Sequence, residues 1–293
     1  MASAVAISGD YEIAYEIYGK LSDPVVLLVN GLGSQMIGYR TAFCDRLVDE
    51  GFCAIRYDNR DVGHSTKTTG EPPVLHHIRD DMRAGRSVNV AYRVADMAAD
   101  GIAVLDAAGV DRAHVFGMSM GGMIVQTMGY TAAQRLLSIT SVMSSTGSRK
   151  VGVPTPEAAE MLVKPRPADI EGAIAMDVEE RRLEAGRWFD EVEVEGYVRA
   201  QYERCHHPSG VAFQYAAIVA DGDRTDRLGT ITTPTTVIHG DMDPLVTASG
   251  GEATAAAIPN ARLVMVEGMG HHLPPETWDI CIEELKCLLS RSS

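Results

Sequence analysis

One serine of the chain lies in a pattern that can turn its hydroxyl into a nucleophile. The pattern, G-x-S-x-G, runs from Gly117 to Gly121 around Ser119, between an apolar run at 113–116 and a helix-compatible run at 123–130. A sharp strand-to-helix turn of this kind holds a serine in a strained conformation and exposes its hydroxyl. The flanking glycines are needed because the two backbones approach too closely for a Cβ atom. The motif predicts acyl-transfer chemistry at Ser119.

A serine nucleophile needs a base and an acid that orients the base. In doubly wound hydrolases both follow the nucleophile in the chain, the acid first and then the histidine, each just after a strand. Here the apolar runs 235–238 and 263–266 are each followed by suitable side chains. The residues themselves leave two alternatives for each role: Asp241 or Asp243 for the acid, and His271 or His272 for the base.

The runs around these residues predict the elements that must position them. Residues 4–8 and 11–18 alternate polar and apolar side chains, which predicts an antiparallel hairpin at a sheet edge. Residues 25–29 are apolar throughout, which is typical of a parallel strand covered on both faces. Further strands are expected at 53–57, 113–116, 138–143, 235–239 and 261–266, and helices at 39–50, 93–108, 123–130 and 277–289. This alternation predicts an α/β fold with a doubly wound, mostly parallel sheet of eight strands.

One segment, 147–229, interrupts this alternation. It carries several prolines and then charged helical stretches, without a buried-strand run. We interpret it as a helical cap inserted into a core formed by 1–146 and 230–293; the alternative is a surface excursion with no role in binding. The side chains expected to line an apolar pocket under this cap are Met36, Trp188, Phe189, Tyr197, Tyr202, Phe213 and Tyr215.

The composition narrows the classes of partner. The net charge is −14, with 26 Lys and Arg against 40 Asp and Glu. This balance argues against nucleic-acid and anionic-membrane partners, since both require concentrated basic residues. No segment approaches the roughly 18 apolar residues of a membrane span. The sequence does not define the oligomeric state, and it is compatible with a homodimer.

The five cysteines are an odd number without close metal-ligand spacing, and we expect reduced thiols in a cytoplasmic protein. The N-terminal stretch lacks a basic region, so no signal peptide is expected. The pairs His76-His77 and His206-His207 do not have the i, i+4 spacing of helix metal ligands, and no metal site is expected there. His64 is expected to pack or hydrogen-bond locally, and the methionines around Ser119 are expected in the core: Met118, Met120, Met123 and Met128.

Five motifs occur in a fixed order along the chain: Asn30-Gly31-Leu32-Gly33, the stretch from Arg56 to Ser65 (RYDNRDVGHS), the G-x-S-x-G elbow, Gly240-x-x-Asp243 and Gly268-x-Gly270-His271. Together they resemble the α/β-hydrolase superfamily, and specifically its lid-bearing serine esterases of the aclacinomycin methylesterase type. The resemblance covers nearly the whole chain outside the cap.

The resemblance implies roles for individual residues. Ser119 would be the nucleophile, Asp243 the orienting acid and His271 the base, and the backbone N–H groups of Leu32 and Met120 would form the oxyanion hole. Asn30 stands where the family usually has histidine. The oxyanion donors are main-chain groups, so this difference is expected to change the packing of the loop rather than remove the hole.

The expected activity is therefore that of a cofactor-independent serine hydrolase. Its partner would be a small, largely apolar molecule with a carboxylic ester, cleaved through an acyl-enzyme. The same residues would serve a lactonase, a carbon–carbon hydrolase or a perhydrolase of the haloperoxidase kind. A small-molecule receptor with vestigial hydrolysis is the alternative from another class.

Overall fold

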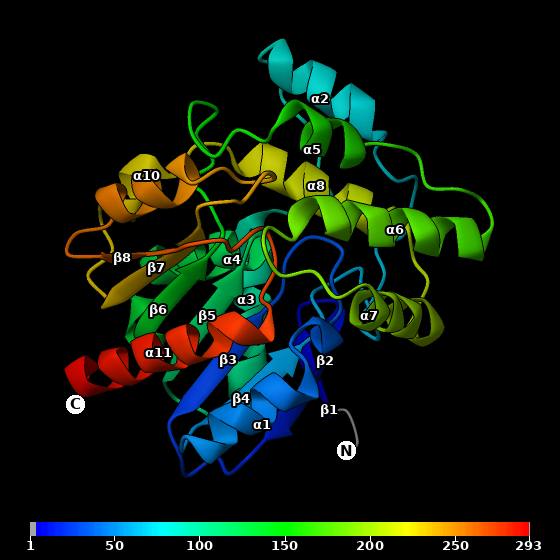
Figure 1. The fold of residues 1–293 in the computed structure, drawn as a ribbon. Helices are drawn as coiled ribbons and strands as arrows, with labels where there is room; N and C mark the ends of the chain where they lie inside the picture. The colour runs from blue at the N-terminus through cyan, green and yellow to red at the C-terminus, as the bar shows by residue number, and fades with distance from the viewer. Residues whose placement is uncertain (1–3, 293) are drawn as a thin grey trace.

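The computed structural model describes residues 4–292 and places eight strands in one sheet (Figure 1). Residues 1–3 and 293, which the predicted core includes, lie outside the described residues. The spatial order is β1-β2-β4-β3-β5-β6-β7-β8. β2 pairs antiparallel with β1 and β4, and every other neighbouring pair is parallel. The strands are β1 (Ala4–Ser8), β2 (Tyr11–Tyr18), β3 (Val25–Val29), β4 (Cys53–Tyr57), β5 (Ala113–Met118), β6 (Leu136–Val142), β7 (Thr235–Gly240) and β8 (Arg262–Val266).

The predicted α/β class and mostly parallel sheet are confirmed, and burial explains why the central strands were recognisable. Every residue of β3, β4 and β7 is buried, since helices cover both faces of the sheet. The edge strand β8 is different, because Leu263 and Met265 are exposed to solvent. Apolar runs in the sequence therefore predicted both the covered strands and the edge strand β8.

Helices flank the sheet on both faces. Side chains of α3 and α4 belong to the core on one face, and side chains of α1 and α11 belong to the core on the other. Gly51 and Gly109 follow α1 and α3 with positive φ angles of 86° and 73°, which suits a helix C-terminus. The α-helices of this part of the fold are α1 (Thr41–Asp49), α3 (Val94–Ala107), α4 (Met120–Thr131), α10 (Ser249–Ala257) and α11 (Trp278–Ser292). The short 3₁₀ helices are η1 (Met36–Gly38), η2 (Ala133–Arg135) and η3 (Pro275–Thr277).

The segment 147–229 contains helices and no β-strand. α6 and α7 bury a small apolar cluster of their own between them, and α5, α6 and α8 lie together beyond one end of the sheet (Figure 1). We keep the name cap segment for 147–229. Its helices are α5 (Pro156–Met161), α6 (Ile170–Glu184), α7 (Glu191–Arg204), α8 (Ser209–Asp221) and α9 (Thr225–Leu228).

One helix beside the cap segment was not predicted. α2 (Leu75–Arg83) lies between β4 and α3 in the chain and contacts α8. Its sequence, LHHIRDDMR, is mostly polar, but Leu75, Ile78 and Met82 recur at helical spacing. That spacing was the signal that could have revealed it. Within residues 4–292, no helix combines the length and apolarity that are needed to cross a lipid bilayer.

Candidate active site

Ser119 occupies a strained turn between β5 and α4. Its backbone has φ 55° and ψ −117°, a conformation that side-chain-bearing residues rarely adopt and that costs roughly 1–3 kcal/mol. Two hydrogen bonds hold the turn: Ser119 N–H donates to Val142 O at 2.9 Å, and Ser144 Oγ donates to Ser119 O at 2.8 Å. The nucleophile candidate is thus fixed by the neighbouring strand β6 and by the loop that follows it.

The two glycines of the motif are required by close backbone contacts. A Cβ atom at Gly117 would lie 2.1 Å from Gly121 O, and one at Gly121 would lie 2.0 Å from Val29 O. Both obstacles are backbone atoms, which cannot rotate away as a side chain can. The predicted close approach of strand and helix is confirmed.

His271 connects Ser119 to Asp243. Its Nε2 lies 2.9 Å from Ser119 Oγ, and its Nδ1 lies 2.7 Å from Asp243 Oδ2. The other carboxylate oxygen of Asp243 accepts from Leu245 N–H at 2.9 Å and Val246 N–H at 2.8 Å. Burial alone would lower the pKa of His271, but the charge and hydrogen bond of Asp243 raise the pKa above its ordinary value. This is the geometry of a general base with an orienting acid.

The two competing residues are engaged elsewhere. Asp241 Oδ1 accepts from Gly268 N–H at 2.6 Å, and His272 Nε2 donates to Trp188 O at 2.7 Å. Burial lowers the pKa of His272 to about 4. The structure therefore brings Ser119, His271 and Asp243 together, and it places Asp241 and His272 in loop-supporting contacts.

The loop after β3 makes a tight turn next to Ser119. Ser34 N–H donates to Gly31 O at 3.3 Å, and Gly33 has a φ of 69°, as the third residue of a type II turn requires. Among the described residues Leu32 N–H has no hydrogen-bond partner. Met120 is the first residue of α4, so its N–H lacks an intrahelical acceptor. An oxyanion hole made by Leu32 and Met120 stays a prediction that this geometry allows.

Two glutamines of the cap segment hold this loop, and the sequence did not predict either contact. Gln214 is fully buried; its Oε1 accepts from Gly33 N–H at 2.8 Å and its Nε2 donates to Arg60 O at 2.7 Å. Gln201 Oε1 accepts from Gln35 N–H at 3.2 Å. A lone glutamine in the apolar run AFQYAAI of α8 was the available signal for Gln214.

Asn30, which replaces the family's histidine, supports the same loop from the core side. Its Nδ2 donates to Gln35 O at 3.0 Å, and its backbone oxygen accepts from Asn59 Nδ2 at 3.0 Å. Asn30 is fully buried. These contacts agree with the expected effect on loop packing.

The histidine loop is fixed by the end of α6. Glu184 O accepts from His271 N–H at 2.6 Å, and Gly268 O accepts from Arg187 N–H at 2.8 Å. Gly186 and Met269 form an isolated antiparallel bridge between these contacts. Thus the cap segment fixes the loop that carries His271.

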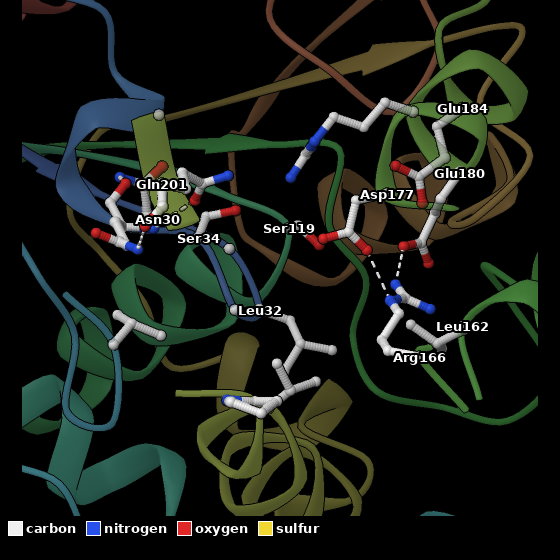
Figure 2. Close-up of a pocket in the computed structure, with 18 of the residues that line it drawn as sticks. Asn30, Leu32, Ser34, Ser119, Leu162, Arg166, Asp177, Glu180, Glu184 and Gln201 are labelled. Atoms are coloured by element: carbon white, nitrogen blue, oxygen red, sulfur yellow. Dashed lines mark hydrogen bonds and ion pairs between the residues drawn. The ribbon is translucent and has the colours of Figure 1, made fainter. Parts of the chain in front are cut away.

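Ser119, labelled in Figure 2, and His271 line a cavity of about 800 Å³, within the usual range for small-molecule sites. Of the side chains expected there, Phe189, Tyr197 and Tyr202 line it. The expectation is wrong for Met36 and Phe213, which are buried in the core, for Trp188, which packs against the core, and for Tyr215, which is not part of the lining. Helical position alone could not tell which aromatic side chains face a cavity.

Other residues singled out in the sequence are distributed around the cavity. His76, His206 and His207 line it, whereas the His64 side chain is exposed and its backbone N–H donates to Asp58 Oδ2 at 2.9 Å. Met120, Met123 and Met128 are core residues as expected, but the half-buried Met118 lines the cavity.

The cavity is not uniformly apolar, contrary to our expectation. Arg166 Nε lies 2.6 Å from Asp177 Oδ1, and the same guanidinium pairs with Glu180; both interactions are drawn in Figure 2. Glu184 lies beside Glu180 on this wall, and burial raises its pKa to about 7. These charges come from one face of α6 and its preceding loop, a pattern that reads as an ordinary solvated helix face in the sequence.

Fold and site together define the class of the protein: it is a serine hydrolase with the α/β-hydrolase fold. Residues 21–277 match the family described as serine aminopeptidase, S33. The match covers most of the chain, and the chain belongs to this family.

Named relatives support a hydrolase of ester substrates. The chain is 29% identical over 279 residues to a rhodomycin D methylesterase, DnrP, of Streptomyces peucetius, covering 87% of each chain. It is 23% identical to 3-oxoadipate enol-lactonase 2 of Acinetobacter baylyi, covering 88% of this chain and 86% of the relative. In fold it is similar to the 2-hydroxy-6-oxo-6-phenylhexa-2,4-dienoate hydrolase of Rhodococcus sp. strain RHA1, with a TM-score of 0.76, 19% identity and coverage of 99% and 98% of the two chains.

Proposed function

We propose that the protein hydrolyses a carboxylic ester of a small, largely apolar molecule through an acyl-enzyme on Ser119. The observation that carries the proposal is the continuous hydrogen-bond relay Ser119–His271–Asp243, with spacings of 2.9 and 2.7 Å, at the cavity wall. The methylesterase and enol-lactonase relatives support an ester as substrate. The five free cysteines are consistent with a cytoplasmic location, which we also propose.

In the first half-reaction Ser119 Oγ attacks the ester carbonyl carbon while His271 Nε2 accepts the hydroxyl proton. The carbonyl oxygen becomes an oxyanion that accepts hydrogen bonds from the N–H groups of Leu32 and Met120. Collapse breaks the bond to the alcohol oxygen, and His271 returns the proton to the departing alcohol. Asp243 keeps His271 in the tautomer whose Nε2 is free to accept.

In the second half-reaction water attacks the acyl-enzyme, and His271 Nε2 takes one proton of that water. The second oxyanion occupies the same hole. Its collapse breaks the acyl–Oγ bond, Ser119 regains its proton from His271, and the carboxylic acid leaves. No external electron donor or acceptor is needed.

The test compares Ser119→Ala with Ser290→Ala, a change at an exposed serine of α11. With p-nitrophenyl butyrate, Ser119→Ala should lose turnover, while Ser290→Ala should keep it. A fluorophosphonate should label Ser119, and mass spectrometry of the peptides can identify the labelled residue. Turnover in Ser119→Ala would overturn the scheme, and absence of both labelling and turnover in the wild type would favour a binding protein.

A further inference from the structure

Arg181 of α6 lines the cavity that contains Ser119, and its guanidinium has a donor atom without a partner. Its Nε atom is buried and has no hydrogen-bond partner. Within the described part of the chain, no carboxylate lies within the 4.0 Å that defines an ion pair with it. The guanidinium carbon lies over the Tyr197 ring, 5.3 Å from its centre. The side chain is half-buried; burial lowers the pKa of Arg181, but Tyr197 and the carboxylates of α6 raise it above its ordinary value. The guanidinium is therefore charged, and it keeps a hydrogen-bond donor for a group that enters the cavity.

Other arginines of the region already have carboxylate partners. Arg166, on the same cavity wall, pairs with Asp177 and Glu180 (Figure 2). Arg182, the next residue of α6, pairs with Glu191 at 2.9 Å on the outside of the cap segment. Asp177 and Glu180 stabilise the charge of Arg181 only at longer range, because both form their ion pairs with Arg166.

Glu184 is the carboxyl group that must be weighed against Arg181. It lies one helical turn further along α6 and lines the same cavity, and its backbone oxygen holds the His271 loop. No ion pair joins it to Arg181 among the described residues. Glu184 attracts the guanidinium electrostatically at longer range and opposes every negative charge that enters the cavity. A ligand with one anionic group fits this arrangement better than one with two.

Arg181 is also near the proposed chemistry. Its charge acts on both His271 and His272, and His271 contacts Ser119. An anionic group bound by Arg181 would therefore belong to the same molecule as the ester that reaches Ser119. Guanidinium presents two parallel donors that match the two oxygens of a carboxylate.

We propose that Arg181 binds a carboxylate of the substrate, so that the preferred esters carry one free acid group, as half-esters of dicarboxylic acids do. The inference rests on the proposed ester hydrolysis and names its substrate class. Arg181 selects the substrate, and the relay through Ser119 performs the cleavage.

The test uses monomethyl esters of linear dicarboxylic acids with five to eight carbons, each paired with the isosteric ester whose free acid is replaced by a primary amide. Methyl esters are stable without enzyme, and the chain length scans the distance between Arg181 and Ser119. The wild type should prefer the acid over the amide at one or more lengths, measured as a ratio of kcat/KM values.

Arg181→Gln should lower kcat/KM for the acid by roughly 10- to 100-fold, as expected for losing a charged hydrogen-bond pair, and change the amide less than about threefold. Arg182→Gln is the matched control with the same charge change one residue away, and it should keep the preference. Glu184→Gln should increase the preference, because it removes the opposing charge. If Arg181→Gln does not fold, Arg181→Lys keeps the charge without the planar fork and should lower the preference in part.

The inference is overturned if the wild type prefers the amide at every length, or if Arg181→Gln lowers both members of a pair equally. Either result leaves the proposed ester hydrolysis standing, because the amide esters are still cleaved. Cleavage that persists in Ser119→Ala contradicts the proposed function instead. The two failures are therefore distinguishable in one set of assays.

Discussion

Gln214 of α8 accepts a hydrogen bond from Gly33 N–H at 2.8 Å, although the two residues lie 181 positions apart in the chain. The bond joins the cap segment to the turn that carries Leu32. Gln214 also donates to Arg60 O at 2.7 Å, so both ends of its amide are engaged and its orientation is fixed. The cap segment thus supports the predicted oxyanion turn directly.

We expect Gln214→Leu to reduce kcat by roughly 10-fold or more with little change in KM. Removing an oxyanion donor outright costs about 10²–10³ in rate, and this substitution frees the turn without removing the donor. Steady-state kinetics with p-nitrophenyl butyrate measure the effect. The rate of phosphonylation of Ser119 should fall in parallel, because the phosphonate also forms a tetrahedral, negatively charged centre.

A second glutamine separates positioning from general stability. Gln201 accepts from Gln35 N–H at 3.2 Å, beyond the turn itself. Gln201→Leu should therefore reduce kcat less than Gln214→Leu does. If Gln214→Leu lowers the melting temperature but leaves kcat and phosphonylation unchanged, its role is structural only.

The acids Asp243 and Asp241 are expected to respond differently to the same change. In the wild type, His271 Nδ1 lies 2.7 Å from a carboxylate oxygen of Asp243. Asp243→Asn replaces this carboxylate with an amide and should lower kcat by about 10³–10⁴, as in related triads. Asp241→Asn keeps an oxygen that can accept from Gly268 N–H, so its loss should stay below about 10-fold. Equal losses in the two variants would contradict the assignment, and the ratio of their kcat values is the measurement.

Local patterns were sufficient to predict the sheet and the elbow. Continuous apolar runs such as 25–29 mark covered strands, and the small residues around Ser119 mark a close backbone approach. Spacing from the strand ends also brought Asp241, Asp243, His271 and His272 into consideration. It could not choose between neighbours, because their directions depend on the loop conformation; the resemblance to known esterases favoured Asp243 and His271, which the structure joins to Ser119.

Contacts between distant segments were out of reach of such patterns. Gln214 and Arg181 are ordinary helix residues in the sequence, and their importance comes from the backbone or cavity that they face after folding. The polar helix α2 was missed for a related reason, since it contacts α8 of the cap segment. A single sequence predicts which face of a helix is apolar, but it does not predict which other element that face contacts.

We expect the activity to fall at low pH, because His271 becomes protonated there. Burial lowers the pKa of His271, but the charge and hydrogen bond of Asp243 and the charge of Glu184 together raise it above its ordinary value. The base must be neutral to accept the proton of Ser119, so kcat/KM decreases as the pH drops through this raised pKa. A profile of kcat/KM against pH, measured with a neutral methyl ester, gives the midpoint.

Two substitutions should move that midpoint in opposite directions. Glu184 raises the pKa of His271 and Arg181 lowers it, so Glu184→Gln should shift the acid limb to lower pH and Arg181→Gln to higher pH. The exposed Arg182 serves as the control, and Arg182→Gln should leave the midpoint in place. Shifts of the same sign in Glu184→Gln and Arg181→Gln would show that His271 does not control the acid limb.

Two glycine-to-alanine changes in helices should have opposite effects on stability. At Gly121 a Cβ atom would lie 2.0 Å from Val29 O, a backbone atom of β3, whereas at the exposed Gly196 of α7 nothing lies within 4 Å. Gly121→Ala must push α4 away from β3, and we expect a loss of about 3 kcal/mol or more in the free energy of unfolding. Gly196→Ala should gain about 0.5–1 kcal/mol, because alanine restricts the unfolded chain more than glycine does. Denaturant unfolding followed by circular dichroism measures both free energies. If Gly121→Ala is as stable as the wild type, the elbow around Ser119 does not depend on the close approach of Gly121 to Val29.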